Sequence, residues 1–423
     1  MGKRGVWSVL VATALIVSAC SSSDDEGAGD SVASVESTPE TTAPPETTAA
    51  PETTAAPETT AAPETTTPAT TAAPETTAAP ATTAPAGPDF SAIGPAVQTF
   101  VDDNAMTGAG LVVVDREDGI VHEEYWREFD ADRVSLIASS SKMITAGVLL
   151  HLADQGLLDM DAPVADAVEW GSGNPDITPA QLVSNSSGLV GLNPEPTYAP
   201  YLCQFLPDRE IEECAAEAFT TPDDDADIVP PDTEFRYGGV QWQIAGAVAE
   251  AVSGKTWAEL IDEIYIQPCG VDSLGYNNHW LSAGGFEYPT DLDLAALAPT
   301  ENPHMEGGAY IDPPDYAALL LMHLRDGECD GGQVLSPEAV ATAHADRVAT
   351  YGDAGGPDVG YGMGWWVERD STRIHDAGAY GSFPWLDVAN GYGAYLVVED
   401  GGGVGAALYG EVVPLVEAAM GVG

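Results

Sequence analysis

Lysine is almost absent from this chain. Lys3, Lys142 and Lys255 are the three lysines in 423 residues, and lysine and arginine together number 13 against 67 aspartates and glutamates. A formal net charge of −54 would repel nucleic-acid phosphates, so we expect no nucleic-acid partner. The composition fits a protein adapted to salt or, more simply, an acidic exported protein.

Cysteine is scarce as well, and its spacing argues against zinc. Neither Cys-x-x-Cys nor His-x-x-x-His occurs, so we expect no metal site, and nothing in the sequence indicates a cofactor. Four cysteines follow Cys20, and an even number suggests disulfides in an exported chain. Three pairings are possible. We favour Cys203–Cys214 with Cys269–Cys329, because the first pair brackets one short loop.

Long apolar runs are missing too, since no stretch after the N-terminus has 18 consecutive apolar residues. The first apolar run, residues 6–17, follows Lys3 and Arg4 and ends at Val17-Ser18-Ala19-Cys20, which matches a lipobox. We therefore predict a lipoprotein signal peptide over residues 1–19, lipidation of Cys20 and a membrane-anchored, cell-surface location. The alternative is an ordinary secretory signal that contains a cysteine.

Residues 20–86 are predicted to be a disordered linker. They repeat units such as Pro51-Glu52-Thr53-Thr54-Ala55-Ala56 and contain no aromatic residue. Such a segment cannot bury enough apolar surface to offset the entropy of ordering the chain. The remaining residues, 87–423, carry 56 acidic and 11 basic side chains and form the predicted folded domain.

The hydrophobic pattern of this domain indicates an α+β fold. Helices are expected over 89–103, 139–155, 241–252, 315–325 and 413–420, with another beginning at 177–182. Strands are expected over 109–115, 120–126, 361–368, 373–375, 391–399 and 403–409. Strands near both ends predict an antiparallel sheet built from both termini and flanked by helices, with a helical lobe inserted in the middle.

One of the three lysines lies in a pattern with chemical meaning, Ser139-Ser140-Ser141-Lys142. Ser-x-x-Lys at the start of a helix places a hydroxyl and an amine on one face, where the amine can take the proton of a serine nucleophile. The alternative is a serine N-cap followed by a surface lysine.

The blocks around this motif resemble the serine hydrolase family of class C β-lactamases, DD-peptidases, related esterases and 6-aminohexanoate-dimer hydrolases. The resemblance covers nearly all of 87–423 and implies the β-lactamase/transpeptidase-like fold. The blocks that carry it are Ile137 to Lys142, Leu157 to Val164, Ile177-Thr178, Ser184-Asn185-Ser186-Ser187-Gly188-Leu189, Phe235-Arg236-Tyr237-Gly238-Gly239 and Glu250 to Gly254.

The resemblance implies a role for each matching residue. Ser139 would be acylated, Lys142 and Tyr237 would take its proton, and Tyr237 would then serve the leaving group and the deacylating water. The N–H groups of Ser139 and Ala379 would form the oxyanion hole. Asn185, Gly239, Asp376 and Gly378 would line the substrate site.

Two departures from the family pattern bear on the substrate. Gly239 occupies the third position of Tyr-x-Asn, so the amide that usually contacts substrate is missing. The Lys-Thr-Gly-like motif can be aligned in two frames. In the first, Asp376 replaces the motif cation and Gly378 is the motif glycine. In the second, His375 is the motif cation and Ala377 replaces the glycine. We favour the first frame, because glycine allows close approach of backbone to substrate.

An acidic Asp376 would repel an anionic substrate, so the sequence favours an esterase or amidase that cleaves a neutral or cationic small molecule or peptide. A β-lactamase, a D-alanyl peptidase and an inactive penicillin-binding-like surface module are the alternatives. Strand aromatics could line an acyl pocket or belong to the core: Trp365, Trp366, Tyr380, Phe383 and Trp385. The run Asp223-Asp224-Asp225-Ala226-Asp227 is expected to be a solvated loop rather than a calcium site.

Overall fold

A computed structural model describes residues 87–192, 198–220, 227–283, 285–294, 297 and 300–422. The predicted signal peptide, Cys20 and the linker lie outside the described residues, as do residues 223–226 of the acidic run. Their assignments therefore remain predictions from the sequence.

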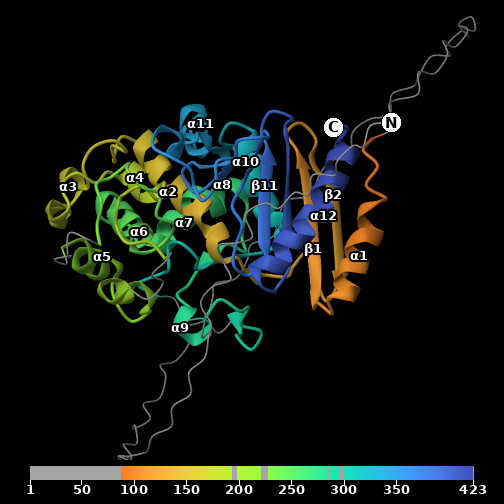
Figure 1. The fold of residues 1–423 in the computed structure, drawn as a ribbon, viewed down its shortest axis with the longest axis horizontal. Helices are drawn as coiled ribbons and strands as arrows, with labels where there is room; N and C mark the ends of the chain where they lie inside the picture. Colours follow the sequence, from red (N-terminus) through yellow and green to blue (C-terminus); the bar gives the residue numbers. More distant parts are fainter. Residues whose placement is uncertain are drawn as a thin grey trace, which may run out of the picture. The chain divides into compact units, whose positions relative to one another are not determined.

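The described domain is organised around a seven-stranded antiparallel sheet in the order β2-β1-β12-β11-β10-β9-β8. The hairpin near the N-terminus pairs with the last strand of the chain, so the sheet combines both ends of the domain as predicted (Figure 1). The strands are β1 (Gly108–Asp115), β2 (Gly119–Arg127), β8 (Val359–Tyr361), β9 (Trp366–Glu368), β10 (Arg373–His375), β11 (Ser382–Asp387) and β12 (Tyr392–Val397).

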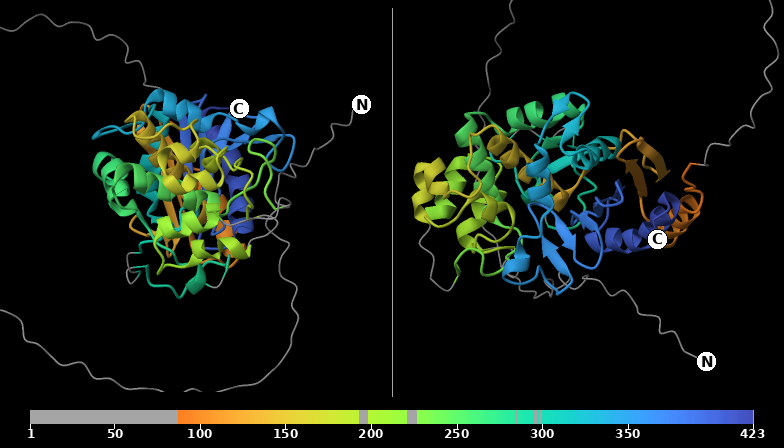
Figure 2. Two further views of the ribbon diagram at one scale, coloured as in Figure 1. Left: turned by 90° about the vertical axis from the view of Figure 1, so that its left-hand side faces the viewer. Right: turned by 90° about the horizontal axis from the view of Figure 1, so that it is seen from above.

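Helices cover both faces of this sheet because side chains of a strand alternate between its faces. Leu111 and Val113 of β1 share a core with α1 (Ile93–Asp103) and α12 (Gly402–Met420). Val112 and Val114 share the other core with α2 (Lys142–Asp154) and with α10 (Pro313–Leu324). Figure 2 shows α1 and α12 together on one side of the β1–β2 hairpin.

A helical lobe is inserted between β2 and β8, as predicted. It contains α2 (Lys142–Asp154), α3 (Val164–Ala167), α4 (Pro179–Val183), α5 (Ile211–Thr220), α6 (Val240–Ser253), α7 (Trp257–Ile261), α8 (Gln267–Cys269), α9 (Trp280–Ala283), α10 and α11 (Pro337–His344). Short strands complete it: β3 (Ser135–Leu136), β4 (Gly275–Tyr276), β5 (Ala309–Ile311), β6 (Glu328–Cys329) and β7 (Gly332–Gln333). The disulfides Cys203–Cys214 and Cys269–Cys329 confirm the favoured pairing.

Three secondary-structure predictions need correction. Residues 403–409 are not a strand but the start of α12, where Gly405 packs so closely on Gly381 that a Cβ would lie 2.6 Å from the Gly381 Cα. The expected strand over 361–368 is two short strands, β8 and β9, and the sequence pattern missed β11 altogether. By length and composition α12 could cross a membrane, but it packs on the sheet through Leu408, Val412 and Val416.

Candidate active site

Ser139 lies on a tight 3-10 turn, Ala138–Ser141, that leads directly into α2. Ala138 adopts φ 46°, a left-handed conformation that costs free energy in a residue with a Cβ and is concentrated at functional sites. The turn leaves Ser139 half-exposed, whereas Ser140 and Ser141 are fully buried. Of the three consecutive serines, Ser139 is therefore the one that a substrate can reach.

Lys142 lies one turn further along and is fully buried. Its Nζ donates a hydrogen bond of 3.1 Å to Ser139 Oγ and another of 3.0 Å to the backbone oxygen of Glu306. The same Nζ is 3.2 Å from the Glu306 carboxylate, with which it forms a buried ion pair. The alternative of a surface lysine is thus wrong, because the amine points inward at the serine hydroxyl.

Tyr237 approaches the same two residues from the turn that precedes α6. Its ring centroid is 4.6 Å from Lys142 Nζ, and the Ser139 side chain is near enough to lower the pKa of its phenol in part. Trp366 of β9 packs on the other side of the phenol ring, with the two ring centroids 5.0 Å apart. The three residues predicted to form the catalytic centre therefore lie together, although they come from distant parts of the sequence.

The protonation states of this cluster are coupled. Burial alone would lower the pKa of Lys142, but Tyr237, Glu306 and Asp376 together outweigh burial and the pKa is raised. Burial raises the pKa of Tyr237, and the nearby Lys142 ammonium offsets this only in part. The resting state is therefore a protonated amine beside a neutral phenol, and one proton must leave this pair before it can act as a base.

The backbone around Ala379 has the features of an oxyanion hole. Gly378 packs against the turn that carries Ser139 so tightly that a Cβ would lie 2.1 Å from the Ile137 carbonyl oxygen. Its N–H donates to Ser382 O at 2.8 Å. Within the described part of the chain, the N–H of half-exposed Ala379 donates to no protein acceptor. This arrangement favours the frame that assigns glycine of the Lys-Thr-Gly-like motif to Gly378.

Four residues expected to line the substrate site are buried instead, and each contacts protein. Asp376 Oδ2 accepts the Met143 N–H at 3.0 Å, near the start of α2, and burial raises the pKa of this carboxyl well above its usual range. Asn185 Oδ1 accepts N–H groups of Gly238 and Trp242, both at 2.9 Å. Gly239 and Gly378 are also buried. Asp376 therefore does not present a negative charge to a substrate, which corrects the repulsion argument made above.

The aromatic residues of the last strands divide into two groups. Trp365, Trp385 and Tyr380 are fully buried and Phe383 nearly so, whereas Trp366 remains half-exposed beside Tyr237. Tyr380 stacks on half-exposed Trp280 at 5.3 Å, in a cluster that also includes Ala138 and Ala379. His375 is a neighbour rather than a participant, since its ring packs on Phe383 and burial lowers its pKa to about 4.

The sequence analysis missed Glu306, which contacts Lys142 although 164 residues separate the two. The residue lies just before β5, and no motif in the sequence singled it out. Among the described residues, no group of three or more histidines, cysteines, aspartates or glutamates is placed to hold a metal ion.

Comparisons with known proteins extend these observations. Residues 95–412 match the family model described as Beta-lactamase. The chain is 25% identical over 338 residues to Penicillin-binding protein 4 of Amycolatopsis lactamdurans, with 75% of this chain and 82% of that protein covered. It is 28% identical over 177 residues to Esterase/beta-lactamase LipL of Mycobacterium tuberculosis, covering 39% of this chain and 36% of LipL.

A solved structure of a penicillin-binding protein homologue from Pyrococcus abyssi superimposes with a TM-score of 0.59 and 19% identity, covering 78% of each chain. At this identity the likeness concerns the fold.

Proposed function

The chain belongs to the Beta-lactamase family of serine hydrolases, and from this premise we propose that it cleaves an ester or amide through an acyl-enzyme on Ser139. The observation that carries the proposal is the 3.1 Å hydrogen bond between buried Lys142 Nζ and half-exposed Ser139 Oγ, with the Tyr237 ring centroid 4.6 Å from the same amine. A serine hydroxyl is a weak nucleophile until a neighbouring base removes its proton.

The reaction begins when Ser139 Oγ attacks the substrate carbonyl carbon and its proton passes to the deprotonated Lys142–Tyr237 pair. The carbonyl oxygen becomes an oxyanion, which the N–H groups of Ser139 and Ala379 stabilise. The tetrahedral intermediate collapses, the bond to the leaving group breaks, and Tyr237 returns the proton to that group. Water, activated by the same pair, then cleaves the Ser139 ester and releases the acid.

An esterase or amidase activity is favoured over a β-lactamase activity. The position of the family's motif cation holds Asp376, so that position offers no positive charge to the carboxylate of a β-lactam. Trp366, which packs on Tyr237, and Trp280, which lies in one cluster with Ala138 and Ala379, are only partly buried and supply apolar surface suited to an uncharged acyl group.

A D-alanyl peptidase is the second candidate, because the similarity to Penicillin-binding protein 4 extends over 75% of the chain. One plate assay compares a short-chain nitrophenyl ester, a chromogenic cephalosporin and a D-Ala-D-Ala peptide, with Ser139→Ala and Tyr237→Phe as controls. We expect Ser139-dependent turnover of the ester. Preferred release of D-alanine would support the peptidase, and no turnover of any substrate would support the inactive binding module.

We also propose that the protein is exported and lipid-anchored through Cys20, with residues 20–86 as its stalk. The two disulfides support an oxidising compartment outside the cytoplasm. Metabolic labelling with an alkyne fatty acid should modify the wild-type protein but not the Cys20→Ala variant. Equal labelling of both would exclude the anchor.

A further inference from the structure

Glu306 has contacts that the proposed reaction does not yet use. Its side chain is 3% exposed, and both carboxylate oxygens accept the Gly239 N–H at 3.0 Å. Oε2 also pairs with Lys142 Nζ at 3.2 Å, while the Glu306 backbone oxygen accepts a hydrogen bond from the same amine. One residue thus binds the amine beside Ser139 and the backbone two residues after Tyr237.

Gly239 explains why this carboxylate comes from another segment. The family pattern has an asparagine at this position, but Gly239 adopts φ 86° and ψ −169°, a conformation that essentially only glycine occupies. A Cβ would lie 2.9 Å from the Val190 carbonyl oxygen. No side chain fits there without a backbone shift, so position 239 cannot itself supply a polar side chain to Lys142.

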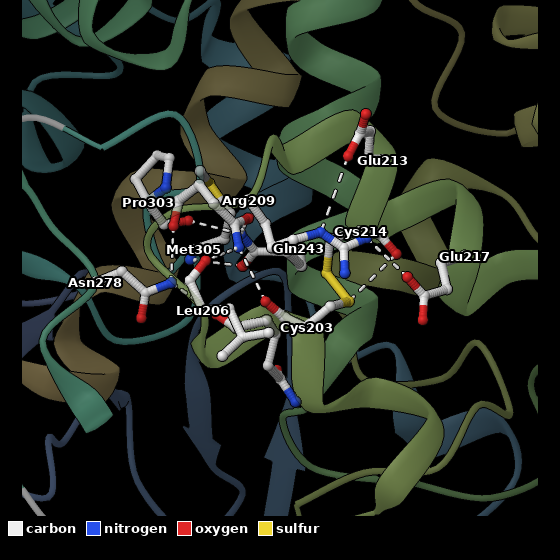
Figure 3. The surroundings of a disulfide bond; sticks show 12 residues. Cys203, Leu206, Arg209, Glu213, Cys214, Glu217, Gln243, Asn278, Pro303 and Met305 are labelled. Atoms are coloured by element: carbon white, nitrogen blue, oxygen red, sulfur yellow. Dashed lines mark hydrogen bonds and ion pairs between the residues drawn. A yellow bond between two sulfur atoms is a disulfide. The ribbon is translucent and has the colours of Figure 1, made fainter. Parts of the chain in front are cut away.

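The segment that delivers Glu306 is held rigidly. Gln243 of α6 donates to Asn302 Oδ1 at 2.6 Å and to Pro303 O at 2.7 Å, and accepts the Met305 N–H at 3.2 Å. Asn302 in turn donates to the Cys203 and Leu206 backbone oxygens. Figure 3 shows this network beside the Cys203–Cys214 disulfide. The bracing fixes Glu306 on a rigid support rather than on a free loop.

We propose that Glu306 is a positioning residue that holds Lys142 against Ser139 and anchors the Tyr237–Gly239 turn. The inference rests on the proposed function for its meaning in catalysis. Its physical content, a carboxylate that keeps Lys142 protonated, can be measured without any turnover.

Four titratable groups face Lys142 and decide its protonation: Tyr237, Glu306, Asp376 and, more distantly, His304. His304 is buried and its pKa lies well below its usual range, so it is neutral. Asp376 Oδ1 is buried without a hydrogen-bond partner among the described residues, and burial raises the pKa of this carboxyl well above its usual range. Glu306 is the carboxyl within ion-pair distance of the ammonium, and it also accepts the Gly239 N–H.

The scarcity of lysine makes a direct test possible. Protein with 13C at lysine Cε has three signals at most, and Lys255→Arg assigns one of them. We expect the Lys142 signal to titrate above pH 10.5 in the wild type and about 1 to 3 pH units lower in Glu306→Gln. Glu250→Gln is the matched control. Glu250 also accepts a backbone N–H, but it lies ten residues along α6, so the Lys142 titration should not move.

A purely structural role would not shift this titration. The same Lys142 midpoint in wild type and Glu306→Gln would overturn the proposal. If Glu306→Gln does not fold, the wild type still decides, because a Lys142 midpoint below pH 10.5 contradicts a carboxylate that holds the proton. Glu306→Asp, which keeps the charge, should restore most of the raised midpoint.

The rate of Ser139 labelling by a fluorophosphonate separates the two proposals. In Glu306→Gln the alkaline limb of the rate should move to lower pH, and the plateau should fall about 10- to 100-fold because Lys142 is less well placed. If no variant labels, the hydrolase proposal fails while the lysine titration still tests Glu306. If wild type and Glu306→Gln label with identical pH profiles, the hydrolase proposal stands and the Glu306 inference fails.

Discussion

Replacing Lys142 with methionine should show how much the buried Lys142–Glu306 ion pair contributes to the free energy of unfolding. The change keeps an unbranched side chain, one heavy atom shorter, but removes the ammonium 3.2 Å from the Glu306 carboxylate. At an effective dielectric constant of ~20, two unit charges at this separation attract by about 5 kcal/mol. Removing one partner of a buried pair costs about 3 to 5 kcal/mol, because the other charge is left uncompensated.

The cost should depend on pH. Without Lys142, Glu306 must either stay charged in the interior or bind a proton, and burial already raises its pKa. Neutralising a carboxyl with an ordinary pKa of 4.5 costs about 5 kcal/mol at pH 8 but only about 1.4 kcal/mol at pH 5.5. A carboxyl whose folded-state pKa is raised destabilises more as pH rises, so Lys142→Met should be most damaging at alkaline pH.

Urea unfolding followed by tryptophan fluorescence measures both predictions. Lys142→Met should lower the free energy of unfolding by about 3 to 5 kcal/mol at pH 8 and by roughly 1 to 2 kcal/mol at pH 5.5. The double variant Lys142→Met with Glu306→Gln should recover to within about 1 kcal/mol of wild type. A loss below about 1 kcal/mol at pH 8, or an equal loss at both pH values, would refute the reasoning.

Three further predictions concern other parts of the structure. His323 is buried and His344 lies half-buried beside it, and desolvation lowers both pKa values, that of His344 to about 4. Folding stability should therefore fall as pH drops below 6.5, with His344 contributing about 2 kcal/mol of this loss at pH 5. A His344→Gln variant whose stability in urea falls as much between pH 7 and pH 5 as that of the wild type would count against this prediction. Replacing Cys203 and Cys214 with alanine should lower the free energy of unfolding in urea by about 3 kcal/mol. It should also slow the labelling of Ser139, because the loop that the disulfide closes braces the segment that carries Glu306. An unchanged labelling rate would show that the disulfide does not influence the site. Hydrolysis should accelerate at mildly alkaline pH, because Lys142 and Tyr237 have raised pKa values. It should also accelerate with added sodium chloride, because salt screens the acidic surface that favours the protonated amine. A rate that is the same from low to high salt would contradict the salt dependence.

The main architecture could be predicted from the sequence because the hydrophobic patterns of single helices and strands agreed with the order of the blocks that resemble the serine hydrolase family. A turn at Glu117-Asp118-Gly119 between two short runs identified β1 and β2, and the apolar stripe after Ser139 identified α2. The pattern failed where tertiary packing overrides it. Among the glycines in the first turn of α12, Gly405 packs closely on Gly381, where a Cβ would lie 2.6 Å from the Gly381 Cα. Pro384 argues against a strand, yet it lies inside β11, where its carbonyl accepts the Asp376 N–H just after β10 ends.

The residues of the candidate site likewise fall into those that the sequence could identify and those that only the folded structure brings together. Ser139, Lys142 and Tyr237 could be identified because their motifs are local in sequence. Glu306 could not, because its partner Lys142 is 164 residues away and only folding brings them together. The orientation of Asp376 was equally hidden, since a sequence assigns a residue to a motif without showing whether its carboxylate faces solvent or the Met143 N–H.

The central claim is that Ser139 is the nucleophile, and the site of covalent modification tests it most directly. Wild-type protein is treated with a fluorophosphonate, digested, and the peptide that contains Ser139, Ser140 and Ser141 is sequenced by tandem mass spectrometry. We predict one adduct, on Ser139, that is absent from Ser139→Ala and much slower to form in Tyr237→Phe. An unmodified peptide, or equal labelling of the Ser139→Ala variant, would contradict the account.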